Sequence, residues 1–253
     1  GGAAMIEESL KNSFARDITL MKQVGINVAV VHGGGPQIDK ELEKSNIKRN
    51  FIDGIRVTDK ETIEIVSNTL DGIINKEIVD LINKNGGNSI GVAKDKKGTI
   101  SVQKLTTENI DYGYVGEVVN VNSNYLYELM NSNYIPVIAP LGYDSSGQIY
   151  NINADTAASQ IASHLSAEKL IFLTDTQGVN DDKGNLISTL NSKEIKNFIE
   201  SDIIRGGMLP KINASLEAVS KSVKTAHIID GRIQHSVLLE IFTNDGIGTL
   251  VKK

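Results

Sequence analysis

Cysteine is absent from this chain of 253 residues, and no stretch approaches the roughly 18 consecutive apolar residues of a membrane-spanning helix. The lack of cysteine excludes a disulfide framework, thiolate catalysis and sulfur-ligated metal, and it fits a reducing compartment. The chain start, from Gly1 to Met5, has neither the basic segment nor the apolar segment of a signal peptide. We therefore expect a cytoplasmic protein without a membrane partner.

Strong charge of either sign is also lacking, because the formal net charge is −5 and the pI is about 5.5. This balance gives no general affinity for polyanions, so we expect no nucleic-acid partner. The four histidines lack the close spacing of metal ligands, and we expect no metal site built from side chains. The length suits one domain, or two closely packed lobes that divide somewhere near residues 145 to 175.

Helical periodicity alternates along the chain with short β-branched runs. The expected strands cover residues 27–32, 135–139, 170–174 and 226–229, and the expected helices cover 10–24, 58–85, 155–164 and 210–222. Thr58 and Glu61 have the spacing of a capping box at the start of the longest helix. Such alternation is typical of an α/β protein with an open, mainly parallel sheet and helices on both faces. Residues 89–121 differ, since their short β-rich pieces between glycine and lysine turns predict antiparallel hairpins.

The glycines Gly33 to Gly35 follow the first expected strand directly, and Pro36 suits the first turn of a helix. Because glycine lacks a Cβ atom, the backbone N–H groups can close on an anionic ligand at a helix N-terminus. A tight turn between a strand and a helix needs only one or two glycines. We therefore interpret this run as an anion-binding loop.

The same loop has a second interpretation, since His32 to Gly35 match an esterase oxyanion motif and Ser89 lies in a G-x-S-x-G pattern. A nucleophile elbow requires a strand, a sharp turn and a helix, in that order. Ser89 instead follows a helix and precedes a segment without helical periodicity. We interpret Ser89 as the start of a hairpin strand and keep an α/β-hydrolase esterase as an alternative.

Other segments carry polar residues where ligands bind in α/β proteins, each with an ordinary structural alternative. Arg56 could bind a carboxylate through its planar fork or be a surface arginine. Asp155 could act in a site or be only a helix-start carboxylate. Residues 174–179 form a glycine loop at the carboxyl end of a strand, where ligands usually lie. Lys211, at the start of a helix, is disfavoured by the helix dipole, which suggests an anionic partner.

Taken together, these segments resemble the amino-acid kinase superfamily and, within it, the acetylglutamate kinases. The resemblance covers nearly the whole chain and rests on GGAAM, VHGGGPQID, DGIRVTD, DYGYVGEVVNVN, NINADTAA, TDTQGV and GGMLPKI. The glycine motifs are shared with carbamate kinase, aspartokinase and glutamate 5-kinase. The arginine of IRVTD and the G-x-V-G-E-V hairpin are the features that single out the acetylglutamate kinases.

The resemblance implies a single amino-acid kinase domain over residues 1–253, with an acceptor-binding lobe of about 1–150 and an ATP-binding lobe of about 151–253. The acceptor, N-acetyl-L-glutamate, would be bound by Gly34, Gly35, Arg56 and Asn151, and the hairpin region near 89–121, with Lys96 and Lys97, would form part of a lid. The residues expected to bind ATP are Gly2, Thr174, Asp175, Gly178, Ile203, Ile204, Arg205 and Lys211. Mg²⁺ would be held mainly by the nucleotide phosphates.

The implied reaction is in-line transfer of the γ-phosphoryl group to the side-chain carboxylate of the acceptor, in arginine biosynthesis. Lys211 would stabilise the transferred charge. Asp155 would orient lysines rather than act as a base, because the carboxylate nucleophile of the acceptor is already ionised near neutral pH. The family pattern also has a phosphate-binding lysine two residues before the first glycine pair. Since the chain starts at Gly1, we expect this lysine and the first strand to precede the sequence given.

The tail from Gly231 to Val251 resembles that of the arginine-inhibited members. By this resemblance His235, Glu240 and Gly246 would bind L-arginine, the enzyme would be a homo-oligomer, either a dimer or a hexamer, and a PII-type regulator is a further candidate partner. The alternative to feedback is a simple dimer without it. A non-catalytic module of the same fold that senses an amino acid is the alternative to an enzyme.

Overall fold

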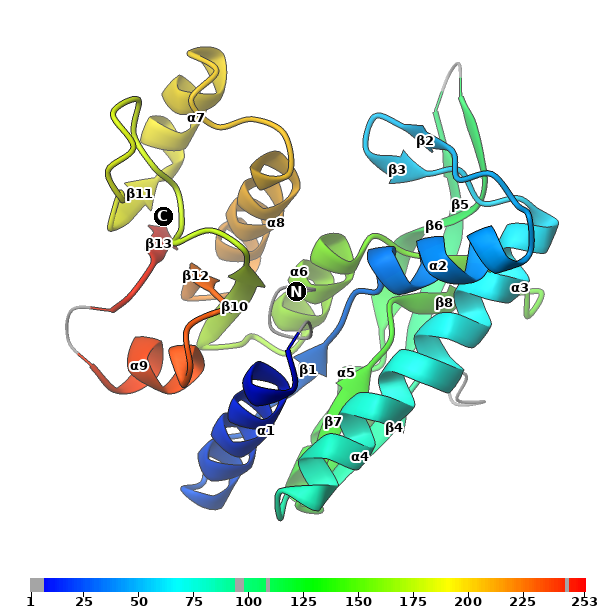
Figure 1. Ribbon diagram of the computed structural model, residues 1–253, viewed down its shortest axis with the longest axis horizontal. Helices are drawn as coiled ribbons and strands as arrows, with labels where there is room; N and C mark the ends of the chain where they lie inside the picture. The colour runs from blue at the N-terminus through cyan, green and yellow to red at the C-terminus, as the bar shows by residue number, and fades with distance from the viewer. Residues whose placement is uncertain (1–6, 94–97, 108–109, 244–245) are drawn as a thin grey trace. The chain divides into compact units, whose positions relative to one another are not determined.

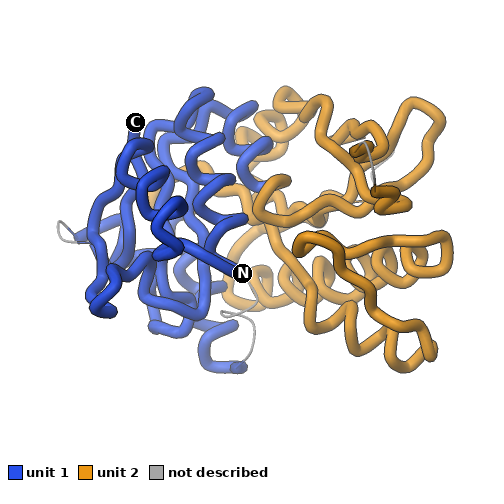
Figure 2. The backbone as a smooth tube through the Cα atoms, turned by 90° about the horizontal axis from the view of Figure 1, so that it is seen from above, with its two compact units in different colours: residues 1–21, 158–253 blue, residues 22–157 orange. Residues whose placement is uncertain are grey.

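The computed structural model describes residues 7–93, 98–107, 110–243 and 246–253, and within them the chain divides into two compact units. Unit 2 consists of Lys22–Ala157, and unit 1 consists of the residues up to Met21 together with Ala158–Lys253 (Figure 2). Two helices, α1 (Glu8–Gln23) and α6 (Ala154–His164), run across the division.

The order of elements within each unit follows the alternation expected from the sequence (Figure 1). Unit 2 contains β1 (Val30–Val31), α2 (Gly35–Lys44), β2 (Phe51–Ile52), β3 (Ile55–Arg56), α3 (Lys60–Ser67), the π-helix η2 (Asn68–Asn75), α4 (Lys76–Lys84), β4 (Ser89–Val92), β5 (Ile100–Thr106), β6 (Asp111–Val121), α5 (Ser123–Asn131), β7 (Ile135–Ile138), β8 (Leu141–Tyr143) and β9 (Ile149–Asn151). Unit 1 contains β10 (Lys169–Thr174), β11 (Thr189–Asn191), α7 (Ser192–Glu200), α8 (Met208–Lys221), β12 (Thr225–Asp230), α9 (Ser236–Phe242) and β13 (Thr249–Lys252).

The core of unit 2 is a parallel sheet with the strand order β1-β7-β4. Every residue of β7 is buried, as expected for a strand covered on both faces. The strand predicted over residues 27–32 is confined to β1, where Val30 and Val31 pair with Val137 and Ile138. The α/β prediction is confirmed, and the first predicted strand is shorter than its apolar run.

Ser89 begins β4, which pairs in parallel with β7 rather than in a hairpin. The prediction of a hairpin strand at Ser89 was wrong, because the preceding helix α4 returns the chain to the parallel sheet. The hairpin predicted further on is present, since β5 and β6 pair antiparallel, from Ile100 opposite Val121 to Thr106 opposite Asp111. These strands continue into a closed barrel with β8 and β9. Lys96 and Lys97, assigned to a lid, lie outside the described residues.

The long helical segment after Thr58 begins differently from the prediction. Asp59 is the N-cap of α3, and its Oδ1 accepts a hydrogen bond from the backbone N–H of Thr62 at 2.8 Å. The backbone N–H of Thr58 donates to Tyr112 O, and its carbonyl accepts from the N–H of Tyr114. Its hydroxyl donates to Arg56 O instead of capping the helix, and no capping box forms. The segment is also interrupted by the π-helix η2. π-Helical turns are rare in proteins, and those that occur are often found at functional sites.

Unit 1 is built on a mixed sheet with the order β10-β12-β13-β11, in which β10 and β12 are parallel. The helix α8 packs against β10, β12 and β13, and α9 packs against β12 (Figure 1). An apolar core lies between α8 and the sheet, with Ile212, Ala218 and Ile228 almost wholly buried. The carboxyl ends of β10 and β12 therefore stand side by side on a rigid support.

Candidate active site

The glycine loop joins β1 to α2 in unit 2. Gly34 is the N-cap of α2 and provides no side-chain cap, Pro36 lies in the first turn, and that turn holds no acidic residue. The backbone N–H groups at the start of a helix have no intrahelical partner, and with the helix dipole they favour an anion. A Cβ atom on Gly35 would meet nothing within 4 Å, so space is open there. The loop therefore suits the anion-binding role predicted for it.

Gly34 also has a packing role that the sequence did not indicate. A Cβ atom on Gly34 would lie 2.4 Å from Cδ1 of Ile74 and 2.9 Å from Cδ2 of Leu70, both on η2. Both atoms are the ends of buried side chains, and these would have to shift to admit a side chain at this position. Packing against η2 thus favours glycine at this position, in addition to its suitability for a ligand.

Arg56 ends the β2–β3 hairpin and is only 7% exposed. Its Nη2 donates to Oδ1 of Asp39 at 2.6 Å, and its guanidinium carbon lies 4.5 Å from the ring centre of Phe51. Its Nη1 is buried and has no hydrogen-bond partner among the described residues. Arg56 is therefore no surface arginine: it is a fixed guanidinium with one donor nitrogen left for a ligand.

Asp39 brings Arg56 to the start of α2. Asp39 follows Gly35 by one helical turn and lies on the same face of α2. The hydrogen bond between Asp39 and Arg56 thus holds the guanidinium beside the turn that begins at the glycine loop. An exposed arginine, Arg49, pairs with the other oxygen of Asp39 at 3.3 Å.

The start of α6 reaches the same loop within unit 2. A Cβ atom on Gly33 would lie 3.6 Å from Cβ of Ala154, the first residue of α6. The Oδ1 of Asn153 accepts hydrogen bonds from the backbone N–H groups of Asp155 at 3.0 Å and of Thr156 at 3.1 Å. Asn153 therefore caps the helix, and the half-buried Asp155 in the first turn is not needed as a cap.

Asn151 stands at the end of β9, just before α6. Its backbone pairs with Leu141 of β8 and with Val115 of β6, and its side chain is half-buried. The structure thus gathers Gly34, Gly35, Arg56 and Asp155 at two neighbouring helix starts, with Asn151 on the strand that leads into the second. These are the residues predicted for the acceptor, together with one of the two predicted catalytic residues.

In unit 1 the predicted nucleotide residues follow β10 and precede α8. Thr174 is buried at the end of β10, and its hydroxyl donates to Asp175, which is exposed. Gly178 has a φ of 151°, and a Cβ atom there would lie 2.5 Å from Oγ1 of Thr249. Packing against β13 therefore accounts for this glycine. Gly2, also predicted to bind ATP, lies outside the described residues.

The segment before α8 divides into residues that face the core and residues that face outward. Ile204 is 2% exposed and belongs to the core of unit 1, so only its backbone could contact a ligand. Ile203 is half-buried, and Arg205 is exposed and pairs with Asp202 at 3.2 Å. Gly207 is the N-cap of α8 without a side-chain cap, and the first turn contains no acidic residue and holds Lys211.

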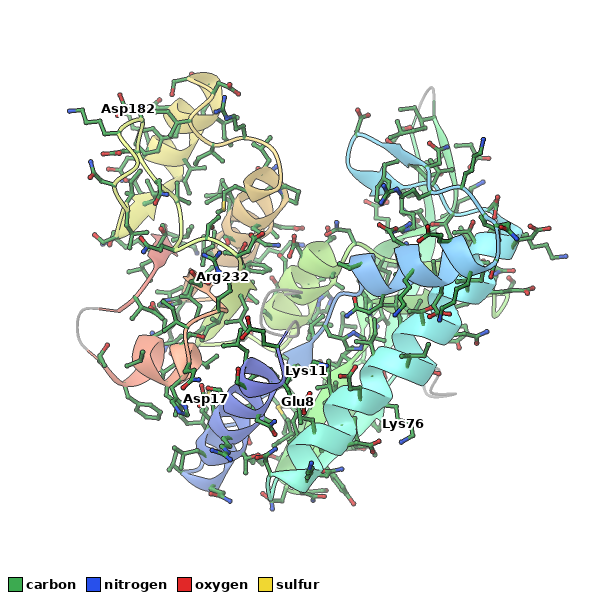
Figure 3. The ribbon with its side chains drawn as sticks, in the orientation of Figure 1. Glu8, Lys11, Asp17, Lys76, Asp182 and Arg232 are labelled. Carbon is green, nitrogen blue, oxygen red and sulfur yellow. The ribbon has the colours of Figure 1, made fainter. Side chains whose placement is uncertain are left out.

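Asp230 and Arg232 form a charged pair beside the predicted nucleotide residues that the sequence interpretation did not single out. Asp230 ends β12, where it is paired in register with Thr174 of β10, and is buried. It accepts hydrogen bonds from N, Nε and Nη2 of Arg232 at 2.9, 2.9 and 2.8 Å, and these bonds hold the pKa of Asp230 below its usual value. Arg232 stands partly exposed at this edge of the sheet (Figure 3). The signal in the sequence was an aspartate closing an apolar strand before Gly231.

The residues predicted to bind arginine separate into two groups. Glu240 is buried; its Oε1 lies 2.6 Å from Nδ1 of His227, and its Oε2 accepts from the N–H of Ile247 at 2.7 Å. Burial acts to raise the pKa of Glu240, but the hydrogen bonds outweigh it and the pKa is lowered. A Cβ atom on Gly246 would lie 3.1 Å from Oε2 of Glu240, so these two residues lie together.

His235 instead joins α9 to α1. Its backbone has a φ of 58°, its N–H donates to the hydroxyl of Ser13 at 2.8 Å, and its Nδ1 lies 2.6 Å from Oδ1 of Asp17. Asp17 is 1% exposed, and burial raises its pKa. The contact fixes the start of α9 rather than completing a cluster with Glu240.

Ser89 does not form a nucleophile elbow. Its hydroxyl donates to Val79 O at 3.0 Å and to Oδ1 of Asn83 at 3.1 Å, and its backbone lies in β4 with no sharp turn to a following helix. The esterase interpretation therefore lacks its structural context. Within the part of the chain that the structure describes, no helix is long and apolar enough to cross a membrane. In that same part no group of at least 3 His, Asp or Glu side chains gathers as a metal site.

Comparison with known proteins gives consistent matches along the chain. A family model described as the amino acid kinase family matches residues 1–230. An acetylglutamate kinase of Ruthia magnifica subsp. Calyptogena magnifica is 52% identical over 257 residues, covering 99% of this chain and 87% of that protein. One from Aquifex aeolicus (strain VF5) is 49% identical over 263 residues, covering 98% and 88%. The crystal structure of smu.665 from Streptococcus mutans UA159 matches with a TM-score of 0.85 at 29% identity, covering 100% of this chain and 95% of that one.

Proposed function

This chain belongs to the acetylglutamate kinases of the amino acid kinase family, and we propose that it transfers the γ-phosphoryl group of ATP to the side-chain carboxylate of N-acetyl-L-glutamate. The observation that carries this proposal is the buried, fixed guanidinium of Arg56. Its guanidinium is buried and fixed by Asp39, while Nη1 has no partner among the described residues. A buried unpaired donor of this kind is costly, and a ligand carboxylate would satisfy it.

The acceptor would bind through unit 2. A carboxylate held by a guanidinium is a poor nucleophile, because its charge is neutralised. Arg56 therefore holds the carboxylate that does not react and leaves the side-chain carboxylate to attack. Asn151 contributes a polar side chain at the end of β9, and Gly34 and Gly35 offer backbone N–H groups at the start of α2. The β5–β6 hairpin is the candidate lid of this lobe.

The nucleotide would bind through unit 1. The uncapped start of α8 offers backbone N–H groups to phosphate oxygens, and Lys211 adds a positive charge in the same turn. Thr174 and Asp175 close β10 at the edge where ligands of α/β sheets bind, with Gly178, Ile203, Ile204 and Arg205 in the adjoining loops. Mg²⁺ would be held mainly by the nucleotide phosphates and would neutralise part of their charge.

The reaction needs positioning and charge stabilisation more than proton transfer. An oxygen of the acceptor carboxylate forms a bond to the γ-phosphorus as the bond to the β–γ bridging oxygen breaks, and ADP leaves with that electron pair. The product is an acyl phosphate, and no proton is transferred. Lys211 and the helix N-termini stabilise the charge on the transferred group. Asp155 orients lysines around that group.

Regulation and assembly belong to the same proposal. We infer that L-arginine inhibits the enzyme through Glu240, Gly246 and His235, that the protein is a dimer or a hexamer, and that a PII-type regulator is a candidate partner. The reaction would serve arginine biosynthesis. The support is the resemblance of residues 231–251 to the arginine-inhibited members and the contact between Glu240 and Gly246.

The test is hydroxylamine trapping of the acyl phosphate from Mg-ATP and N-acetyl-L-glutamate by the purified full-length enzyme, with and without L-arginine. Trapped product that L-arginine suppresses is the expected result. Product insensitive to L-arginine would remove the feedback inference only. Binding of both substrates without product would favour the non-catalytic sensing module over the kinase.

A further inference from the structure

His32 is a buried titratable residue with no assigned role, and it lies directly before the glycine loop. It is 5% exposed, and its Nδ1 lies 3.0 Å from Gly33 O. Its Nε2 lies 3.1 Å from Nδ2 of Asn75, which is 3% exposed. Nδ2 of Asn75 also donates to Val137 O, on β7, at 2.8 Å. A chain of hydrogen bonds thus runs from β7 through Asn75 and His32 to the loop.

This chain of hydrogen bonds fixes the protonation of His32. A carbonyl oxygen can only accept, so the contact with Val137 O identifies Nδ2 as the donor atom of Asn75. The Nε2 of His32 must then accept, and the proton of the neutral ring lies on Nδ1 and is donated to Gly33 O. Burial lowers the pKa of His32 to about 4, so the ring is neutral near neutral pH.

The π-helix supplies the other half of the arrangement. Asn75 is the last residue of η2, and Leu70 and Ile74 of the same turn fill the space that a Cβ atom on Gly34 would need. One wide turn therefore contacts both His32 and the glycine loop. The Oδ1 of Asn75 points at Gly91 of β4, where a Cβ atom would lie only 2.3 Å away. The side chain of Asn75 is held from several directions.

The hydrogen bond from His32 to Gly33 O also affects the next N–H group of the loop, that of Gly34. In a trans peptide the C=O and the N–H point in opposite directions. The hydrogen bond from His32 to Gly33 O therefore turns the N–H of Gly34 away from His32 and fixes its direction. Glycine peptides otherwise reorient easily, since no Cβ atom restricts them. Gly34 is also the N-cap, whose N–H has no partner inside the helix.

We propose that His32 and Asn75 are positioning residues that lock the Gly33–Gly34 peptide, so that the Gly34 N–H is held toward the point where the bound acceptor receives the phosphoryl group. The inference rests on the proposed kinase activity and assigns a role that the substrate-contacting residues do not fill. A donor fixed before the reaction stabilises developing charge without reorganisation. Loss of either residue then lowers turnover more than it weakens binding.

Four single variants test this pair. His32→Gln and Asn75→Ala break the lock. His32→Asn keeps a donor, because its amide nitrogen stands near the position of Nδ1 and can still reach Gly33 O. Ser89→Ala is the matched control, since it removes buried hydrogen bonds of the same unit at the far end of β4. All four are compared by kcat, by KM for both substrates and by thermal stability.

The expected result is a kcat lower by about 10- to 100-fold in His32→Gln and Asn75→Ala, with both KM values within about threefold of the wild type. His32→Asn should recover kcat to within about fivefold, and Ser89→Ala should lose less than about threefold. Equal losses in Ser89→Ala and Asn75→Ala, or raised KM with unchanged kcat, would overturn the proposal.

A spectroscopic readout separates this inference from the kinase activity itself. The ¹⁵N chemical shifts of the His32 imidazole should report a neutral ring with its proton on Nδ1, and the Gly34 amide should have a lower ¹⁵N order parameter in Asn75→Ala, because its peptide is no longer held. A ring protonated on Nε2, or an unchanged Gly34 order parameter, would refute the lock even in an active enzyme. If the wild type forms no acyl phosphate, the proposed function fails, and these measurements still decide the lock.

Discussion

Asp39 accepts a hydrogen bond from Arg56 at 2.6 Å and stands one helical turn after the glycine loop on the same face of α2. This contact explains how a side chain from a separate hairpin reaches the start of a helix. It also leaves Nη1 of Arg56 buried and unpaired among the described residues. The pair therefore places one charged donor at a defined position for a ligand.

Replacing Arg56 by lysine should weaken acceptor binding. Lysine keeps the charge but cannot donate to Asp39 and to a ligand carboxylate with the same planar geometry. We expect Arg56→Lys to raise KM for N-acetyl-L-glutamate by about 10- to 100-fold, the range for losing a hydrogen bond to a charged group, with little change in KM for ATP. Steady-state kinetics with each substrate varied measures both constants.

Arg49→Lys is the control for this prediction. Arg49 pairs with the same carboxylate of Asp39, but its side chain is 71% exposed. Exposed ion pairs contribute little, so the variant should keep both KM values. A similar rise in Arg49→Lys would show that charge near Asp39, and not the buried fork of Arg56, controls binding.

Lys211→Ala should lower kcat by about 10² to 10³, the scale for removing one preorganised group that stabilises charge in the transition state. Lys211 lies in the first turn of α8, behind an uncapped helix start. Lys221→Ala, in the last turn of the same helix, removes an exposed pair with Glu217 and serves as the comparison. A loss of less than fivefold in Lys211→Ala would remove Lys211 from the catalytic machinery.

Asp155→Asn should reduce turnover more than it affects acceptor binding. The carboxylate lies in the first turn of α6, whose cap is supplied by Asn153, so the substitution leaves the helix start intact. If Asp155 orients lysines around the transferred group, its charge matters in the transition state, and kcat should fall with KM for N-acetyl-L-glutamate nearly unchanged. A change in KM alone would show that Asp155 binds the acceptor instead.

Much of the fold could be predicted from hydrophobic periodicity. The helices at 10–24, 155–164 and 210–222 and the strands at 170–174 and 226–229 are present within a few residues. The parallel pairing of β4 could not be found, because a short apolar run after a helix fits a hairpin strand as well as a sheet strand. That choice depends on β7, which lies far along the chain.

Residues of the candidate site could be proposed from the sequence where the residue type itself suggests a ligand, as arginine suggests a carboxylate. Arg56 was identified from its motif, but its burial and its partner Asp39 are tertiary facts. The glycines were harder to interpret, since close packing favours glycine at both Gly34 and Gly178 whether or not a ligand binds there. The pair of Asp230 and Arg232 was missed because its meaning depends on the register of β10 and β12. No local pattern reports such a register.

The burial of His32 should make the protein less stable as the pH falls. The pKa of His32 is lowered from 6.5 to about 4 in the folded state, so the unfolded chain binds the proton more tightly. Stability from this residue is complete above pH 6.5 and is lost between pH 6.5 and about 4, by about 3 kcal/mol in total. Carboxylates whose pKa is lowered in the folded protein, such as Glu240, also reduce stability as the pH falls. The contribution of His32 is therefore isolated by comparison with His32→Asn, whose side chain cannot titrate. Urea unfolding at pH 7 and at pH 4.5 should show a smaller loss of unfolding free energy in His32→Asn than in the wild type, and equal losses would mean that His32 is already protonated or exposed in the folded protein.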